Sequence, residues 1–307
     1  MSRATGNQRR ALLILNPGSR QGGQADLEAG CARLKASGLE LLRVDSDSPE
    51  QSCSAITERH EDVDLVVIGG GDGTVSSCIP ALLESGLPAA ILPLGTANDL
   101  ARSLGIDNLE QAFDVIADGV AARVDLGVVN GHHFFNVANL GLGVKVTEEL
   151  TPEVKQRWGV FSYLKAFAAA LSRHRHFKLR IRVDGTEHAM RSIQLAVGNG
   201  RFYGGGNVVD QHARIDDALL HIYSLRPQTL WELFTLAPLL RGGRHDLAKR
   251  TFSVSAHELY VQTEPAEMEI HADGEPVTKT PASFSVKPAA LEMLVPKQSP
   301  LVEKKRI

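Results

Sequence analysis

Acidic residues lie in or beside glycine-rich turns at three places in the chain. The segment "GGGDGT" (69–74) follows the apolar run "LVVI", "PLGTAND" (93–99) ends another apolar run, and "HADGE" (271–275) lies far downstream. Glycines let backbone N–H groups approach an anion, and a helix that begins after them adds a positive N-terminal end. An aspartate in such a loop repels phosphate unless a cation lies between them. Asp72 therefore predicts Mg²⁺ or an extended water network beside a phosphate group.

Each of these segments also has a plainer interpretation. "GGGDGT" lacks the Lys-Ser/Thr of a Walker A loop and the third glycine of the dinucleotide-binding fingerprint. Taken alone, Thr96 or Asn98-Asp99 would be an ordinary helix cap, and Asp273-Gly274 an ordinary hairpin turn. The two glycine loops gain a functional interpretation as a pair, because open α/β sheets bind ligands at the carboxyl ends of neighbouring strands.

Strand and helix patterns alternate through the first part of the chain. The runs "ALLIL", "LELLRV", "DLVVI" and "AAILP" are short and apolar, and helical patterns separate them, one of them running through "TVSSCIPALLES" (74–85). This alternation predicts βαβ units in a mostly parallel sheet with helices on both faces. Gly38 and Gly86 follow the last periodic positions of two helices and are predicted to end them.

After Val124, β patterns dominate. Two β-rich runs are joined by Asn130-Gly131, the strongest short-range signal for a tight hairpin. Later strands include "FKLRIRV", "SIQLAVG", "MEIHA", "SFSVKP" and a closing "ALEMLVP", and helical insertions at 151–173 and 229–243 interrupt them. The expected fold class is α/β plus β-sandwich. A three-layer α/β nucleotide-binding domain over 1–127 precedes an antiparallel β-sandwich domain over 128–288, and the strand and tail at 289–307 could return to the first domain.

Composition excludes several function classes. A formal net charge of −3 over 307 residues argues against a surface built for nucleic acid. Cys31, Cys53 and Cys78 lack any C-x-x-C pairing, so we expect reduced core or helix residues rather than a disulfide framework or a zinc site. The first apolar run stops at Asn16-Pro17, too early for a signal peptide, and none approaches the roughly 20 residues of a spanning helix. A cytoplasmic protein is expected, with any contact at the inner face of the membrane being peripheral.

Taken together, "NPGS" (16–19), "GGGDGT", "PLGTANDLAR" and "HADGE" resemble the diacylglycerol kinase catalytic-domain family, and especially its bacterial YegS-type lipid kinases. The resemblance covers nearly the whole chain, and the order and spacing of the motifs are more specific than any one of them. It implies ATP-dependent, Mg²⁺-requiring phosphorylation of a lipid hydroxyl in a cleft between the two domains.

The resemblance also implies roles for individual residues. Asp72, Asp99 and Asp125 would build an acidic Mg²⁺ and water network, with Glu275 facing them from the second domain. Asp273 would be the general base on the lipid hydroxyl, in keeping with a phosphoryl transfer that needs mostly positioning and neutralisation of charge. The residues expected to contact ATP are Asn16, Gly70, Gly71, Asp72, Gly73, Thr74, Val75, Ser76, Thr96 and Asn98, with one further contact at Asp45 or Ser46.

A structural Mg²⁺ is implied by the same resemblance in the segment 204–225. Its ligands would be the backbone carbonyls of Arg214 and Leu219 and the side chain of Asp217. This chain departs from the family there, because Ala218 stands where glycine is common. Asp210-Gln211 also replaces a common proline, so the backbone turn and the second metal that depends on it are left open.

Two other function classes stay open. NAD kinases share "GGDGT", although they do not normally carry a "GTANDLAR" loop. A non-catalytic nucleotide or lipid sensor would be favoured by a broken acidic set; that set is intact, but Ser76 and Ser77 stand where many relatives carry Asn-Glu. The acceptor lipid and the oligomeric state, a homodimer included, are open as well.

Several segments could meet lipid or simply serve the fold. The helices around 161–167 and "WELFTLAPLL" could line a lipid cleft, although apolar helix faces more often pack in a core. The basic runs "SRHRHFKLRIR" and "LLRGGRHDLAKR" could meet an anionic membrane. Arg180 and Arg182 alternate along a strand, however, and are predicted to share one solvated face.

Overall fold

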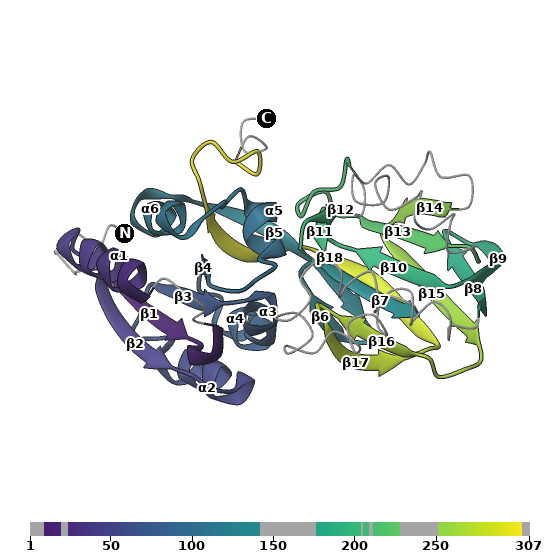
Figure 1. Ribbon diagram of the computed structural model, residues 1–307, viewed down its shortest axis with the longest axis horizontal. Coiled ribbons are helices and arrows are strands. Elements are labelled where there is room, and N and C mark those ends of the chain that lie inside the picture. The colour runs from purple at the N-terminus through teal and green to yellow at the C-terminus, as the bar shows by residue number, and fades with distance from the viewer. Residues whose placement is uncertain are drawn as a thin grey trace, which may run out of the picture. The chain divides into compact units, whose positions relative to one another are not determined.

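The structure, a computed structural model, describes residues 9–19, 24–141, 176–203, 205–208, 211–227 and 251–302 (Figure 1). The chain divides into two compact units, Met1–Val124 with Ala289–Ile307 and Asp125–Pro288. The helical insertions expected at 151–173 and 229–243 lie outside the described residues, and so do the lipid-cleft walls expected on them.

A parallel sheet forms the centre of the first unit. Its strands are β1 (Arg10–Leu15), β2 (Glu40–Asp45), β3 (Leu65–Gly70) and β4 (Ala89–Pro93). They lie in the order β2-β1-β3-β4, with all pairings parallel. Every residue of β3 is buried, as expected of a strand covered on both faces.

Helices flank this sheet on both sides (Figure 1). They are η1 (Pro17–Ser19), α1 (Gln24–Ala36), α2 (Pro49–Arg59), α3 (Asp72–Ser77), α4 (Ile79–Ser85), α5 (Asp99–Leu104) and α6 (Leu109–Asp118). Helix α1 packs on α6, where Gly30 leaves room for the ring of Phe113, and α2 packs on α4. The three-layer α/β arrangement predicted from the sequence is confirmed.

The helix expected over 74–85 is instead two helices. The first ends at Ser77 and the second begins at Ile79, with Cys78 between them. Pro80 explains the break, because its ring removes one backbone donor and clashes with the carbonyl four residues earlier. The predicted ends at Gly38 and Gly86 are confirmed, since both glycines adopt left-handed conformations with φ of 94° and 64°.

Two long strands carry residues of both units. These are β5 (Val120–Val129) and β18 (Ala282–Val295), and the unit boundaries fall after Val124 and after Pro288. The runs "SFSVKP" and "ALEMLVP", expected as separate strands, both lie in β18. Its first part pairs antiparallel up to Ser285, and Met293 pairs in parallel with Ala89 of β4. Pro288, which has no N–H to donate, lies between these two pairings.

The second unit contains two antiparallel sheets. The first has the order β14-β13-β10-β7-β16-β17, and the second joins β18-β15-β8-β9 with the hairpin β5-β6. The bounds are β6 (His132–Phe134), β7 (Val137–Gly141), β8 (Phe177–Val183), β9 (Thr186–Ser192), β10 (Gln194–Gly198), β13 (Leu220–Leu225), β14 (Thr251–Ala256), β15 (Glu258–Glu264), β16 (Glu269–Ala272) and β17 (Glu275–Lys279). Two short strands, β11 (Phe202–Tyr203) and β12 (Asn207–Val208), pair with each other.

One hydrophobic core joins these two sheets. Leu195 and Val197 of β10 belong to the same buried cluster as Leu179 and Ile181 of β8. The β-sandwich is therefore confirmed. The Asn130-Gly131 turn between β5 and β6 is confirmed too, with φ of 46° and 86°.

Two further expectations, for the exposed face of β8 and for the cysteines, are confirmed. In β8, "FKLRIRV" alternates buried and exposed residues, so Arg180 and Arg182 share the predicted exposed face. Cys31, Cys53 and Cys78 are free thiols, and burial raises the pKa of all three, that of Cys78 to about 12, which keeps them protonated. None of the helices built from the described residues combines the length and the apolarity that crossing a membrane requires.

Candidate active site

The first glycine loop links β3 to α3. Gly71 precedes the helix in an extended conformation, and α3 begins at Asp72. A Cβ atom at Gly70 would lie 2.6 Å from the Cβ of Thr74, so packing alone requires glycine there. A Cβ at Gly73, in contrast, would have no atom of the described residues within 4 Å. The fold leaves open space at Gly73, at the exposed start of α3.

Thr74 connects this loop to the "NPGS" turn. It lies inside α3 rather than at its cap, and its hydroxyl accepts a hydrogen bond from Nδ2 of Asn16 at 3.1 Å. The Oδ1 of Asn16 accepts from the N–H of Gly18 at 2.8 Å. Val75 is buried, so its side chain serves the core and only its backbone is left for a ligand. Ser76 is half-buried in the same helix.

The second glycine loop links β4 to α5 and closes on itself through Asn98. Its Oδ1 accepts from the N–H of Gly95 at 3.0 Å, and its Nδ2 donates to the carbonyl of Gly95 at 2.8 Å. Asn98 has φ of 50°, a left-handed conformation that asparagine tolerates better than most residues. Thr96 is exposed in this loop. The side chain of Asn98 shapes the loop and does not cap α5.

Asp72 caps α5 from the other loop. Its Oδ2 accepts the N–H of Asp99 at 3.1 Å, and its Oδ1 accepts the N–H of Leu100 at 2.9 Å. The two loops also touch at their glycines, since a Cβ at Gly95 would lie 2.5 Å from the Cα of Gly71. The two glycine loops therefore form one surface at the carboxyl ends of β3 and β4, where α/β sheets bind ligands.

Asp99 completes the acidic pair of this unit. Its side chain is buried, and its Oδ1 pairs with Nη1 of Arg102 at 3.0 Å. Magnesium in phosphate sites is usually held by one or two carboxylates, with substrate phosphates and waters as its other ligands. Asp72 and Asp99 fit that requirement, being two carboxylates. Both carboxylates also bind groups of the protein, Asp72 the N–H groups of α5 and Asp99 the guanidinium of Arg102.

Asp45 and Ser46, the two candidates for an ATP contact after the second strand, differ in whether a ligand can reach their side chains. Ser46 is buried, and its hydroxyl donates to the carbonyl of Ser48 and accepts from Ser52. Asp45 is exposed beside Arg43. Of the two, Asp45 has the side chain that a ligand can reach.

In the second unit, Asp273 clamps the start of β7. Its Oδ2 accepts the N–H of Phe135 at 2.8 Å, and its Oδ1 accepts those of Asn136 and Val137 at 2.9 and 3.1 Å. The N–H of Asp273 in turn donates to the carbonyl of Val137. Asp273 has φ of 48° and is followed by Gly274 with φ of 98°, so the predicted hairpin turn is present. The carboxylate is held rigidly by three backbone donors.

Asn199 is a polar residue of this region that sequence analysis missed. It lies just after β10, and its Nδ2 donates to the carbonyls of Asp125 and Phe135 at 3.0 and 2.9 Å. Asn199 therefore ties the strand that carries Asp125 to the segment that Asp273 clamps. The run "GNG" at the end of a buried strand was the available signal, but glycines around asparagine are common in ordinary turns.

Asp125 supports a second turn of this unit. It is buried, its Oδ2 accepts the N–H of Ala218 at 2.7 Å, and its own N–H donates to the carbonyl of Ile215 at 2.7 Å. Ala218 has φ of 60°, a conformation that favours glycine. The backbone turn that a glycine would form without strain is thus adopted by alanine, with Asp125 bonded to it.

The residues expected to hold a structural Mg²⁺ do come together in this turn. Asp217 accepts hydrogen bonds from the N–H groups of Arg214 and Leu219, each at 2.9 Å, and from Nε2 of His221 at 2.9 Å. Burial by itself would raise the pKa of Asp217, but these bonds outweigh it and hold the pKa below its usual range. A cation at Asp217 would therefore have to share the carboxylate with these three donors, one of which is the imidazole of His221.

The remaining expected residue is Glu275, which is exposed at the start of β17. Across the described parts of the chain, no group of three or more histidine, cysteine, aspartate or glutamate side chains is placed to hold a metal ion. Of the residues expected in the acidic network, Asp72 and Asp99 lie in the first unit, and Asp125 and Glu275 lie in the second. Asp273, the expected general base, is connected to the strand of Asp125 through Phe135 and Asn199.

Comparison with known proteins covers both units. The family of the diacylglycerol kinase catalytic domain matches residues 10–129, and the YegS C-terminal NAD kinase beta sandwich-like domain matches residues 136–295. A Pseudomonas aeruginosa PAO1 protein named "Probable lipid kinase YegS-like" is 35% identical over 300 residues, which cover 95% of this chain and 96% of that protein. A Mycobacterium tuberculosis H37Rv protein named "Diacylglycerol kinase" is 31% identical over 296 residues, covering 92% and 94%.

Among solved structures, a diacylglycerol kinase is also similar to this chain. The crystal structure of a diacylglycerol kinase from Bacillus anthracis str. Sterne is 25% identical, covers 95% of this chain and 99% of that one, and has a TM-score of 0.74. In this chain the two domain matches together span nearly the full length, from residue 10 to residue 295. This chain therefore belongs to the diacylglycerol kinase catalytic-domain family and, with its YegS-type second domain, to the YegS-like lipid kinases within it.

Proposed function

We propose that this protein transfers the γ-phosphoryl group of ATP to a hydroxyl group of a lipid, in a reaction that requires Mg²⁺. The first unit would hold the nucleotide and the second would hold the acceptor. The observation that carries the proposal is the capping of α5 by Asp72, which joins two glycine loops into one surface at the carboxyl ends of β3 and β4.

The nucleotide would lie on that surface. Open space at Gly73 lets phosphate oxygens approach the backbone at the start of α3, and Thr74 and Asn16 fix the neighbouring turn. Thr96 and Asn98 would contact the nucleotide from the second loop, and Gly70, Gly71, Val75 and Ser76 through the first. Asp72 and Asp99 would hold Mg²⁺, which when bound would reduce the negative charge that an incoming hydroxyl meets.

The acceptor hydroxyl would be met by Asp273. Its carboxylate is fixed by three backbone N–H donors, and each carboxylate oxygen can accept more than one hydrogen bond. We assign it the general-base role. Phosphoryl transfer passes through a loose transition state, so the position of the group that accepts the hydroxyl proton matters more than its strength as a base. A rigidly held carboxylate provides such a position. Asp125 and Glu275 would support the site electrostatically from the same unit.

A lipid acceptor also requires contact with a membrane or a micelle. We infer a peripheral contact, because the described helices do not supply a membrane span.

The proposal is tested by following labelled γ-phosphate from ATP to a panel of micellar lipids, with and without Mg²⁺, and with NAD as a control acceptor. The expected result is a labelled lipid that forms only with Mg²⁺. Labelled NAD would instead indicate a NAD kinase. ATP binding with no labelled product on any acceptor would indicate a nucleotide or lipid sensor.

A further inference from the structure

Two buried polar atoms face each other across neighbouring strands of the six-stranded sheet. Asn139 of β7 and His271 of β16 are direct partners in the antiparallel register, so their side chains leave the same face of the sheet. The Oδ1 of Asn139 and the Nε2 of His271 are both buried, and neither has a hydrogen-bond partner in the described part of the chain. Buried polar atoms normally have partners, so this pair calls for a ligand.

The pair does not belong to the sandwich core. Ala138 and Leu140, on either side of Asn139, lie in that core together with Ala272. Because side chains alternate along a strand, Asn139 and His271 lie on the opposite face of the sheet. This face is therefore distinct from the sandwich core, although Val137, Ala196 and Tyr223 on it are buried as well.

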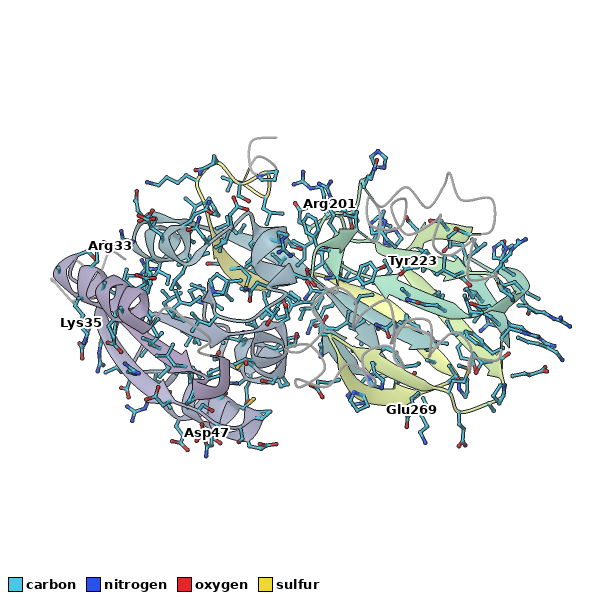
Figure 2. The ribbon with its side chains drawn as sticks, in the orientation of Figure 1. Arg33, Lys35, Asp47, Arg201, Tyr223 and Glu269 are labelled. Carbon is cyan, nitrogen blue, oxygen red and sulfur yellow. The ribbon has the colours of Figure 1, made fainter. Side chains whose placement is uncertain are left out.

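One other polar side chain on this face, that of Tyr223, does have partners. Tyr223, labelled in Figure 2, lies in the same row as Asn139, with Ala196 of β10 between them. Its hydroxyl bonds to Oη of Tyr203 at 2.7 Å and to Nε2 of Gln194 at 3.4 Å. Burial raises the pKa of Tyr223 well above its usual value, so the hydroxyl stays neutral. Among the described residues, Thr251 of β14 on this face and Asn136 and Asn199 near Asp273 also have a buried side-chain oxygen without a hydrogen-bond partner. Asn139 and His271 are the two that are direct partners in the register of β7 and β16.

The pair lies close to Asp273 along the sheet. His271 precedes Asp273 by two residues, and the strand register continues past β16, because the N–H of Asp273 donates to the carbonyl of Val137. Two residues of a strand span roughly 7 Å. A small head group whose reacting hydroxyl meets Asp273 would therefore place its neighbouring groups beside Asn139 and His271.

We propose that Asn139 and His271 recognise a second hydroxyl group in the head of the acceptor lipid, which makes the substrate a lipid with two neighbouring free hydroxyls. This inference rests on the proposed lipid kinase activity. An amide oxygen can only accept a hydrogen bond, and an imidazole nitrogen can donate or accept according to its tautomer. One hydroxyl satisfies both atoms, because its proton reaches Asn139 and its oxygen accepts from His271. The ester oxygens of a diacylglycerol cannot donate, so a monoacylglycerol type of head fits better.

The test uses two lipids that differ in this hydroxyl alone. A 1-monoacylglycerol carries it, and the monoester of 1,3-propanediol with the same acyl chain lacks it. Wild-type protein should phosphorylate the monoacylglycerol with a kcat/KM higher by roughly 10- to 100-fold, since the ester lacking the hydroxyl leaves buried polar groups unpaired. Asn139→Leu and His271→Leu should each lose most of that preference. Gln262→Leu, an exposed change on β15 of the other sheet, should keep it.

Thermal melting separates recognition from a structural role. Asn139→Leu removes an unpaired buried acceptor, so its melting midpoint should equal or exceed that of the wild type. A clearly lower midpoint for Asn139→Leu would assign the side chain to the fold and overturn the inference.

Failure of this inference differs from failure of the proposed function. Equal kcat/KM for the two lipids in the wild type would overturn the inference while leaving the kinase activity in place. The absence of any phosphorylated lipid would contradict the kinase activity instead. Thermal stabilisation by short-chain versions of the two lipids would then test the pair alone. Stronger stabilisation by the monoacylglycerol would support recognition of the hydroxyl, and equal stabilisation would overturn it.

Discussion

The carboxylate of Asp72 caps the helix that begins at Asp99, accepting the N–H of Asp99 at 3.1 Å and that of Leu100 at 2.9 Å. A residue expected to work beside magnesium is thus also the connection between two loops. Both roles depend on the same two oxygens, so they must be separated by experiment.

Asp72→Ala should affect stability and turnover together. Removing a charged acceptor from two backbone donors should cost about 1–3 kcal/mol of unfolding free energy, and turnover should need more Mg²⁺. Asp72→Asn keeps one acceptor oxygen and should recover part of the stability but little of the turnover. Urea unfolding and a magnesium titration of activity measure the two effects. Unchanged magnesium dependence in both variants would remove Asp72 from the metal site.

Gly73 and Gly95 form a matched pair of positions. Gly73→Ala should leave the melting midpoint nearly unchanged, because a Cβ there meets open space, but it should raise the KM for ATP if phosphate approaches that backbone. Gly95→Ala should lower the midpoint, because its Cβ would lie 2.5 Å from the Cα of Gly71. An unaltered KM for ATP in Gly73→Ala would argue against nucleotide binding at this loop.

Asp273→Asn should separate chemistry from nucleotide binding. The loss of a general base typically lowers kcat by roughly 10²–10⁴-fold, whereas the ATP loops are unaltered and the Kd for ATP should stay the same. Single-turnover kinetics and equilibrium ATP binding are the measurements. The asparagine amide cannot accept all three N–H bonds, so a melting curve controls for local unfolding. Turnover like that of the wild type, with the fold intact, would exclude the role.

The carboxylate of Asp217 should make the free energy of unfolding depend on pH in the acidic range. Its pKa in the folded protein is lowered from 3.8, so the unfolded chain binds more protons and stability rises with pH across this window. The contribution is complete above pH 3.8 and is lost as the pH falls through the lower folded value. Asp217→Asn should lack this contribution and show a flatter acid limb in urea unfolding from about pH 5 down to about pH 2. Parallel curves for the two proteins would contradict the assignment.

Magnesium without nucleotide should leave the melting midpoint of the wild type unchanged. Asp217, the side-chain ligand that the family resemblance implies, already accepts three hydrogen bonds, one of them from His221. The check is a melting series in Mg²⁺ and in chelator. A saturable rise in the wild type that disappears in Asp217→Asn would establish the structural metal.

Much of the fold could be predicted because its signals are local. The apolar run of β3, the left-handed glycines at 38 and 86, and the Asn130-Gly131 turn each follow from a few adjacent residues. The single helix expected over 74–85 was wrong because Pro80 breaks it, although the proline was visible in the sequence.

The site was only partly predictable because its contacts are not local. Nothing in "GGGDGT" shows that Asp72 bonds to backbone 27 and 28 residues later. Asn199 joins the carbonyls of Asp125 and Phe135, which lie 74 and 64 residues earlier, and no sequence motif encodes that arrangement. Asn139 and His271 became a pair only once the strand register was known.

The central claim is tested most directly by mass spectrometry of the lipid after incubation with ATP and Mg²⁺. The account predicts one phosphate added per lipid at a hydroxyl, one ADP formed for each, and loss of both products in Asp273→Asn. ADP formation with no phosphorylated lipid, or a phosphorylated lipid formed equally well by Asp273→Asn, would contradict it.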